Sequence, residues 1–141
     1  MANKKTPRGI RNNNPLNIRK GNNWQGERLV QSDPAFEEFE SMQMGIRAAF
    51  KILRNYMTGR DGHYKPCDTI SKIISRWAPE SENATKSYID TVSKLTGINP
   101  YQRIFFNDRQ TMVSLVDAMI YVECGVHVDR SVIQSGYDLL S

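Results

Sequence analysis

Glu123 is the side chain of this sequence whose position most directly suggests chemistry. It ends an apolar helical stretch, four residues after Met119 and seven after Val116, so the helical repeat places it on their face. Burial among apolar side chains disfavours an ionised carboxyl, and the negative end of a helix dipole opposes ionisation further. A carboxyl kept neutral in this way can act as a general acid at a glycosidic oxygen. The same position also suits a carboxylate that pairs with an arginine where the helix ends.

A glycosidase pairs such an acid with a second carboxylate, and several acidic residues between 27 and 40 are candidates. Asp33 is the first choice as the second catalytic residue, ahead of Glu27, Glu38 and Glu40. Its Ser-Asp-Pro context is equally typical of a tight turn. A lytic transglycosylase needs no second carboxylate, because the 6-hydroxyl of the sugar attacks the anomeric carbon. The residues alone leave both mechanisms open.

Aromatic and amide side chains elsewhere could bind a sugar. Trp77 could stack on a pyranose ring, although a place in the core is the stronger interpretation. Asn83 could bind an acetamido group or cap a helix. The asparagines near the N-terminus suit sugar hydroxyls and tight turns alike. The predicted substrate-binding set is Asn13, Asn14, Asn17, Trp24, Glu27, Arg76, Trp77, Glu82, Asn83 and Tyr88.

These residues must be positioned by 141 residues of which 39% are hydrophobic, enough for one domain with a core. Residues 1–16 are expected to form a basic arm and turn region, because their prolines and glycine oppose a regular helix. Turn residues between short apolar runs predict a β-hairpin lobe over 17–40. Apolar periodicity predicts a helical body over 41–141, with helices at 41–59, 68–77, 83–97, 108–123 and 129–140. The predicted fold class is therefore α+β, mainly α, in a single domain.

The charge of the chain is unevenly distributed. The net charge is +4, and residues 1–20 carry Lys4, Lys5, Arg8, Arg11, Arg19 and Lys20 without an acid. Such a segment can attract a polyanion, so a nucleic-acid-binding module is one alternative function. The helices carry mixed charges rather than a basic stripe, which argues against it.

Metal and cofactor chemistry is not expected. His63 and His127 are distant from each other and from the cysteines, so no metal-ligand spacing appears and no cofactor is predicted. Cys67 and Cys124 are expected to be unpaired thiols, as is usual for a protein made in the cytosol. No apolar run approaches the roughly 18 residues of a membrane span, and the N-terminus is not a secretory signal.

Several longer motifs resemble a known family. Residues 8–19, Arg-Gly-Ile-Arg-Asn-Asn-Asn-Pro-Leu-Asn-Ile-Arg, resemble the opening signature of phage and prophage virion-associated, lysozyme-like proteins, a group often described only as structural. The resemblance continues through Trp24–Glu27, Asp33–Phe36, Gly45–Ala48, Ser75–Pro79, Glu82–Thr85, Tyr88 and Val122–Gly125. This chain has Leu16 where the family commonly has glycine, and Cys124 where asparagine is commoner.

The resemblance implies a lysozyme-like domain that cuts the glycan strands of peptidoglycan, with Glu123 as the acid. In lysozyme-like glucosaminidases and lytic transglycosylases the glutamate helix precedes the asparagine-rich segment and the hairpin. Here it comes last, which suggests a circular permutation and predicts that residues 14–17 lie close to Glu123. The implied partners are peptidoglycan and other virion proteins. The protein is expected to be a monomer, made in the bacterial host cytoplasm without a signal peptide and delivered to the cell wall.

A virion structural protein without activity is the main alternative to an enzyme. The feature that favours the enzyme is the acidic residue on an apolar face, because leucine or methionine would stabilise a purely structural helix better.

Overall fold

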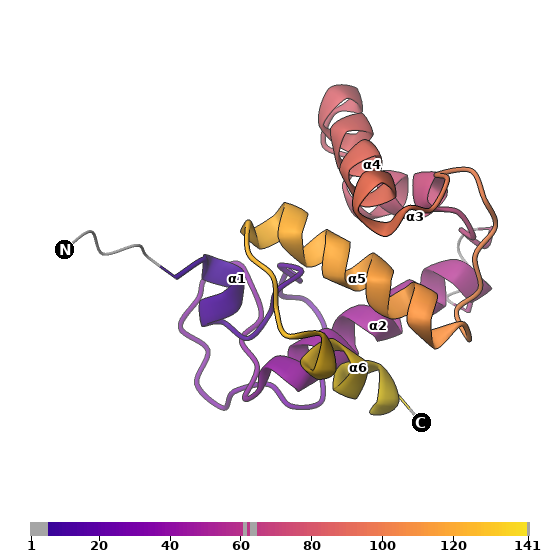
Figure 1. The fold of residues 1–141 in the computed structure, drawn as a ribbon. Helices are drawn as coiled ribbons and strands as arrows, with labels where there is room; N and C mark the ends of the chain where they lie inside the picture. Colours follow the sequence, from indigo (N-terminus) through magenta and orange to yellow (C-terminus); the bar gives the residue numbers. More distant parts are fainter. Residues whose placement is uncertain (1–5, 61, 63–64, 141) are drawn as a thin grey trace.

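The computed structural model describes residues 6–60, 62 and 65–140, and six helices run through them (Figure 1). They are α1 (Arg8–Arg11), α2 (Met42–Thr58), α3 (Ile70–Trp77), α4 (Glu82–Thr96), α5 (Arg109–Cys124) and α6 (Arg130–Asp138). The five longer helices confirm those predicted from apolar periodicity, apart from their end residues. The short helix α1 was not predicted; it follows Pro7, whose missing amide hydrogen is tolerated at the start of a helix.

The predicted fold class, α+β with a β-hairpin lobe, is wrong. Within the described residues the segment 17–40 contains only two isolated antiparallel bridges, Arg19 with Phe36 and Glu27 with Phe39. Side chains form hydrogen bonds with the backbone groups that would otherwise pair between strands. The amides of Ala35 and Phe36 donate to the Asp33 carboxylate. The suggested circular permutation required a hairpin between the asparagine-rich segment and the next helix, so this suggestion is abandoned as well.

Side-chain caps and one glycine determine where the key helices begin and end. Ser81, rather than the predicted Asn83, caps α4 by accepting a hydrogen bond from the amide of Ala84. Gly125 ends α5 in the left-handed conformation with φ 70°, so the chain turns immediately after Glu123 and Cys124.

Helix α5 lies at the centre of the molecule and packs against α1, α4 and α6 (Figure 1). Its predicted core stripe is confirmed, because Met112, Val116 and Met119 are fully buried. Helix α2 packs on α6 and contributes Phe50 and Leu53 to the same core. Helices α2 and α5 thus share one core through α6.

The described part of the predicted arm, residues 6–16, is held on the helical body rather than projecting from it. A Cβ atom at Gly45 of α2 would lie 1.8 Å from the carbonyl oxygen of Asn13, so only glycine allows this contact. Arg8 belongs to α1 and is bound by Asp33, which corrects the expectation of a free basic arm there. Lys4 and Lys5 of the predicted arm lie outside the described residues, as does His63. In the part of the chain that is described, every helix is too short or too polar to cross a membrane.

Candidate functional site

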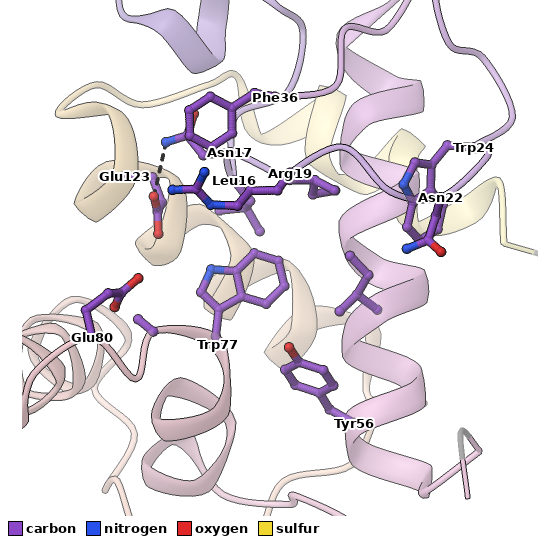
Figure 2. Close-up of a pocket in the computed structure, with 13 residues that line it drawn as sticks. Leu16, Asn17, Arg19, Asn22, Trp24, Phe36, Tyr56, Trp77, Glu80 and Glu123 are labelled. Carbon is purple, nitrogen blue, oxygen red and sulfur yellow. Dashed lines mark hydrogen bonds between the residues drawn. The ribbon is translucent and has the colours of Figure 1, made fainter. Parts of the chain in front are cut away.

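Glu123 lies in the last turn of α5, where two polar side chains from distant segments hold its carboxyl group. The amide of Asn17 donates to Oε1 at 3.1 Å, and the hydroxyl of Tyr88 donates to Oε2 at 3.0 Å (Figure 2). Tyr88 comes from α4 and is buried. Burial, followed by the charge of Glu123, raises the pKa of the Tyr88 hydroxyl well above its usual value, so the hydroxyl stays protonated.

This environment differs from the unpaired carboxyl on an apolar face that the sequence predicts. Glu123 is half-buried and accepts one donor on each oxygen. A tyrosine hydroxyl can accept as well as donate, so the same geometry suits both the ionised and the protonated carboxyl. The arrangement fixes the orientation of Glu123 and leaves its remaining acceptor positions available to a ligand.

The loop that carries Asn17 is anchored by Asn14. The Asn14 amide is completely buried, donates to the carbonyl oxygens of Ile18 and Glu37, and accepts from the amide of Ile18. Asn17 itself has φ 54°, a left-handed conformation that asparagine tolerates better than most residues. The prediction that this segment lies against Glu123 is confirmed.

Cys124, next to Glu123, closes the contact between α5 and the N-terminal loop. Its thiol donates to the carbonyl oxygen of Pro15 at 3.2 Å. Burial and the neighbouring charge of Glu123 raise the pKa of this thiol to about 11, so it stays neutral. Cys67 and Cys124 are both free thiols, as predicted.

Glu123 forms part of the wall of a cleft of about 470 Å³, a volume typical of small-ligand sites. Four aromatic side chains and two amides share this cleft with charged groups. The lining residues are Leu16, Asn17, Ile18, Arg19, Asn22, Trp24, Phe36, Ile52, Tyr56, Trp77, Ala78, Glu80 and Glu123. Figure 2 shows Trp77 between the Glu123 end of the cleft and the end formed by Trp24 and Asn22. Aromatic faces and amide groups are the features with which proteins bind pyranose rings.

The position of Trp77 is compatible with both interpretations drawn from the sequence, a core residue and a residue that stacks on a sugar ring. Its ring meets that of Tyr56 edge to face, with centroids 6.2 Å apart, and it packs on the hydrophobic core. It is nevertheless only half-buried and faces the cleft. One side of the residue thus stabilises the fold, while the other is available for stacking.

Of the predicted site residues, the structure brings four to the cleft wall: Asn17, Trp24, Trp77 and Glu123. Tyr88 stands behind the wall and touches Glu123. The others contribute from outside the lining. Glu27 accepts from the backbone amide of Trp24, and the guanidinium of Arg76 lies 4.0 Å from the centre of the Tyr56 ring. The remaining predicted binding residues outside the lining are Asn13, Asn14, Glu82 and Asn83.

Asp33, predicted as the second catalytic carboxylate, lies away from the cleft in a separate pocket with Arg8 and Glu38. Arg8 donates to both of its oxygens, at 2.6 and 2.5 Å, and Asn12 donates at 2.9 Å. These bonds hold the pKa of Asp33 far below its usual value. The structure gives Asp33 the turn-forming role that was its alternative interpretation and does not bring it to Glu123.

The lining also contains residues that the sequence analysis does not predict as site residues, among them Arg19, Asn22, Phe36 and Glu80. Glu80 is the second carboxylate among the described residues that line the cleft, and it points towards the Glu123 end (Figure 2). Its charge also helps to raise the pKa of Tyr88, which places it close to the same group. The sequence signal that could have identified Glu80 as a site residue is its position three residues after Trp77. The described residues contain no group of three or more histidine, cysteine or acidic side chains that could hold a metal ion.

Comparison with known proteins shows similarity to a bacteriophage protein. Protein P5 of Pseudoalteromonas phage PM2 is 44% identical to this chain over 122 residues, which cover 84% of the chain and 71% of Protein P5. No family model matches the sequence. The bacteriophage part of the predicted resemblance is therefore confirmed.

Proposed function

The chain belongs to the family of Protein P5 of Pseudoalteromonas phage PM2, and on this premise we propose that it is a phage-type enzyme that cuts the glycan strands of peptidoglycan. Glu123 is the general acid of the proposed reaction. The observation that carries the proposal is the oriented Glu123 carboxyl at the wall of an aromatic and amide-lined cleft. An orienting hydrogen bond on each oxygen is what a proton donor requires to face one bond of a bound sugar.

In the proposed reaction Glu123 gives its proton to the glycosidic oxygen while the bond from that oxygen to the anomeric carbon breaks. The positive charge that develops on the sugar is then captured by an oxygen nucleophile. Water, after losing a proton to a carboxylate of the cleft, produces a reducing end. The 6-hydroxyl of the same sugar, whose proton passes to the Glu123 carboxylate, produces a 1,6-anhydro end. Glu80, an exposed carboxylate in the same cleft, is the candidate to assist water.

A non-catalytic role in the phage particle is the second candidate. The observation that favours it is that Asn17 and Tyr88 satisfy Glu123 as they would a structural carboxylate. In that case the hydrogen bonds serve to join α4, α5 and the N-terminal loop. Peptidoglycan would then be neither cut nor bound by the cleft.

The test is digestion of purified peptidoglycan by wild type and by Glu123→Gln, with the released fragments identified by mass spectrometry. Asp90→Asn is the matched control, because Asp90 is exposed on α4 and loses the same negative charge. We expect fragments from wild type and Asp90→Asn but not from Glu123→Gln, with the chemistry of the ends identifying the nucleophile. Fragments from all three proteins would exclude Glu123 as the acid, and fragments from none would favour the structural role.

A further inference from the structure

Arg19 presents a positively charged group inside the cleft, on the side of Asn17 and Phe36 (Figure 2). Its backbone pairs with that of Phe36 in an isolated antiparallel bridge, so the two side chains project on the same face. The guanidinium carbon lies 4.9 Å from the centre of the Phe36 ring, within the range of a cation–π contact. The ring therefore holds the guanidinium in place, while its N–H groups remain available at the edge.

A second arginine, Arg8, also contacts the Phe36 ring, and its partners can be compared with those of Arg19. The guanidinium of Arg8 lies 4.5 Å from the centre of Phe36 and is bound on two nitrogens by Asp33. Arg19 has no such partner, since none of the ion pairs among the described residues includes it. One arginine is thus neutralised within the protein, whereas the other carries its charge into the cleft.

The charges of the cleft indicate what Arg19 would bind. Glu80 and Glu123 both line it, and Arg19 is the cation among the lining residues that the structure describes. The Glu80 carboxylate would repel an anionic ligand unless a cation offsets its charge. A planar guanidinium fork matches the geometry of a carboxylate, with which it can form two parallel hydrogen bonds.

We propose that Arg19 binds a carboxylate that the glycan carries beside the bond to be cut. This inference rests on the proposed function, and it narrows the substrate to glycans with acidic substituents. In peptidoglycan every second sugar bears a lactyl ether, and free carboxylates occur on that group or along its attached peptide. A glycan built only from N-acetylglucosamine carries none. Arg19 therefore distinguishes cell-wall glycan from neutral chitin-like glycan.

The test compares soluble peptidoglycan fragments with the same fragments after their carboxylates have been converted to amides. For wild type we expect kcat/KM to be about tenfold higher on the carboxylate form. Arg19→Gln should lose that preference, with a tenfold lower value on the carboxylate form and an unchanged value on the amide. Arg19→Lys keeps the charge without the fork and should retain part of the preference. Arg11→Gln is the control, because Arg11 is exposed on α1 and lies outside the cleft lining.

Binding supplies a readout that does not depend on cleavage. Calorimetry on Glu123→Gln, with and without Arg19→Gln, should show tighter binding of the carboxylate form only while Arg19 is present. Equal affinities for the two forms, or an equal loss on both when Arg19 is replaced, would overturn the inference and leave the proposed function intact. If wild type neither cuts nor binds either form, both proposals fail.

Discussion

Glu37 should make the protein less stable as the pH rises through neutrality. Glu37 is buried, with only 4% of the residue exposed. Burial, followed by the hydrogen bond and the charge of Glu27, raises its pKa from 4.5 to about 7, while the charge of Lys20 opposes the change. In the folded state Glu37 thus keeps a proton that it loses in the unfolded chain.

The sign and size of the effect follow from linkage. The stabilisation is fully present below pH 4.5, where both states are protonated, and is lost as the pH rises to about 7. At about 1.4 kcal/mol per pKa unit the full difference would be about 3 kcal/mol, and solvent screening around the pair reduces it to about 1–2 kcal/mol. Glu37→Gln keeps the shape and remains neutral, so it should match wild type near pH 4 and exceed its stability near pH 8.

The assay is urea denaturation of wild type, Glu37→Gln and Glu40→Gln at several values between about pH 4 and 8. The free energy of unfolding of Glu37→Gln minus that of wild type removes contributions from other titrating groups. It should rise from near zero to about 1–2 kcal/mol, whereas Glu40→Gln, which changes an exposed carboxylate, should follow wild type. A difference that stays constant with pH would refute the raised pKa of Glu37 in the folded protein.

Three further substitutions test the structure around the cleft. Asp33→Asn breaks the ion pair with Arg8, which lies outside the cleft, so it should lower Tm by several degrees at neutral pH and change kcat little. A loss of kcat without a change in Tm would instead make Asp33 catalytic. Because the pKa of Asp33 is lowered, its stabilisation is present at neutral pH and lost in acid, so the two melting curves should converge as the pH falls. Tyr88→Phe removes one hydrogen bond from Glu123, so it should preserve the fold and lower kcat about tenfold. If kcat in a digestion time course is unchanged, Tyr88 does not position the acid. Gly45→Ala should destabilise the protein by at least about 1–3 kcal/mol in urea denaturation, because its methyl group would overlap the carbonyl of Asn13, and a neutral result would contradict that packing.

The helical body could be predicted because its signals are local. Ser41 caps α2 through the amide of Met44, and both residues belong to one short stretch of sequence. The buried stripe of α5 follows directly from its apolar spacing. These features depend on neighbours within a turn or two, which periodicity and capping rules describe.

The segment 17–40 could not be predicted, because its structure depends on contacts between distant residues. The buried Glu38 carboxylate takes the amides of Ser32 and Asp33, and Asn14 takes backbone groups on both sides of the segment. Apolar alternation and turn propensity do not show that side chains will bind the backbone groups which paired strands would otherwise use. The same limit explains why Arg19 was missed, since its position depends on pairing with Phe36 across the loop.

Within the cleft, Glu123 and its contact with Asn17 could be predicted from the sequence, whereas the presence of Glu80 could not. Glu123 was identified from its place on α5, and a family resemblance predicted its proximity to Asn17, which is confirmed. For the second carboxylate the sequence favours Asp33 over Glu27, Glu38 and Glu40, because it matches the family motif best and follows a predicted strand. Its bonds to Arg8 could not be seen in the sequence.

The most direct test of the account is a crystal structure of Glu123→Gln with a soluble peptidoglycan fragment. We expect a pyranose ring on Trp77, with a glycosidic oxygen within hydrogen-bonding distance of the amide at position 123 and an acidic substituent at Arg19. A fragment bound elsewhere, or a cleft that stays unoccupied at saturating fragment in solution titrations as well, would contradict it.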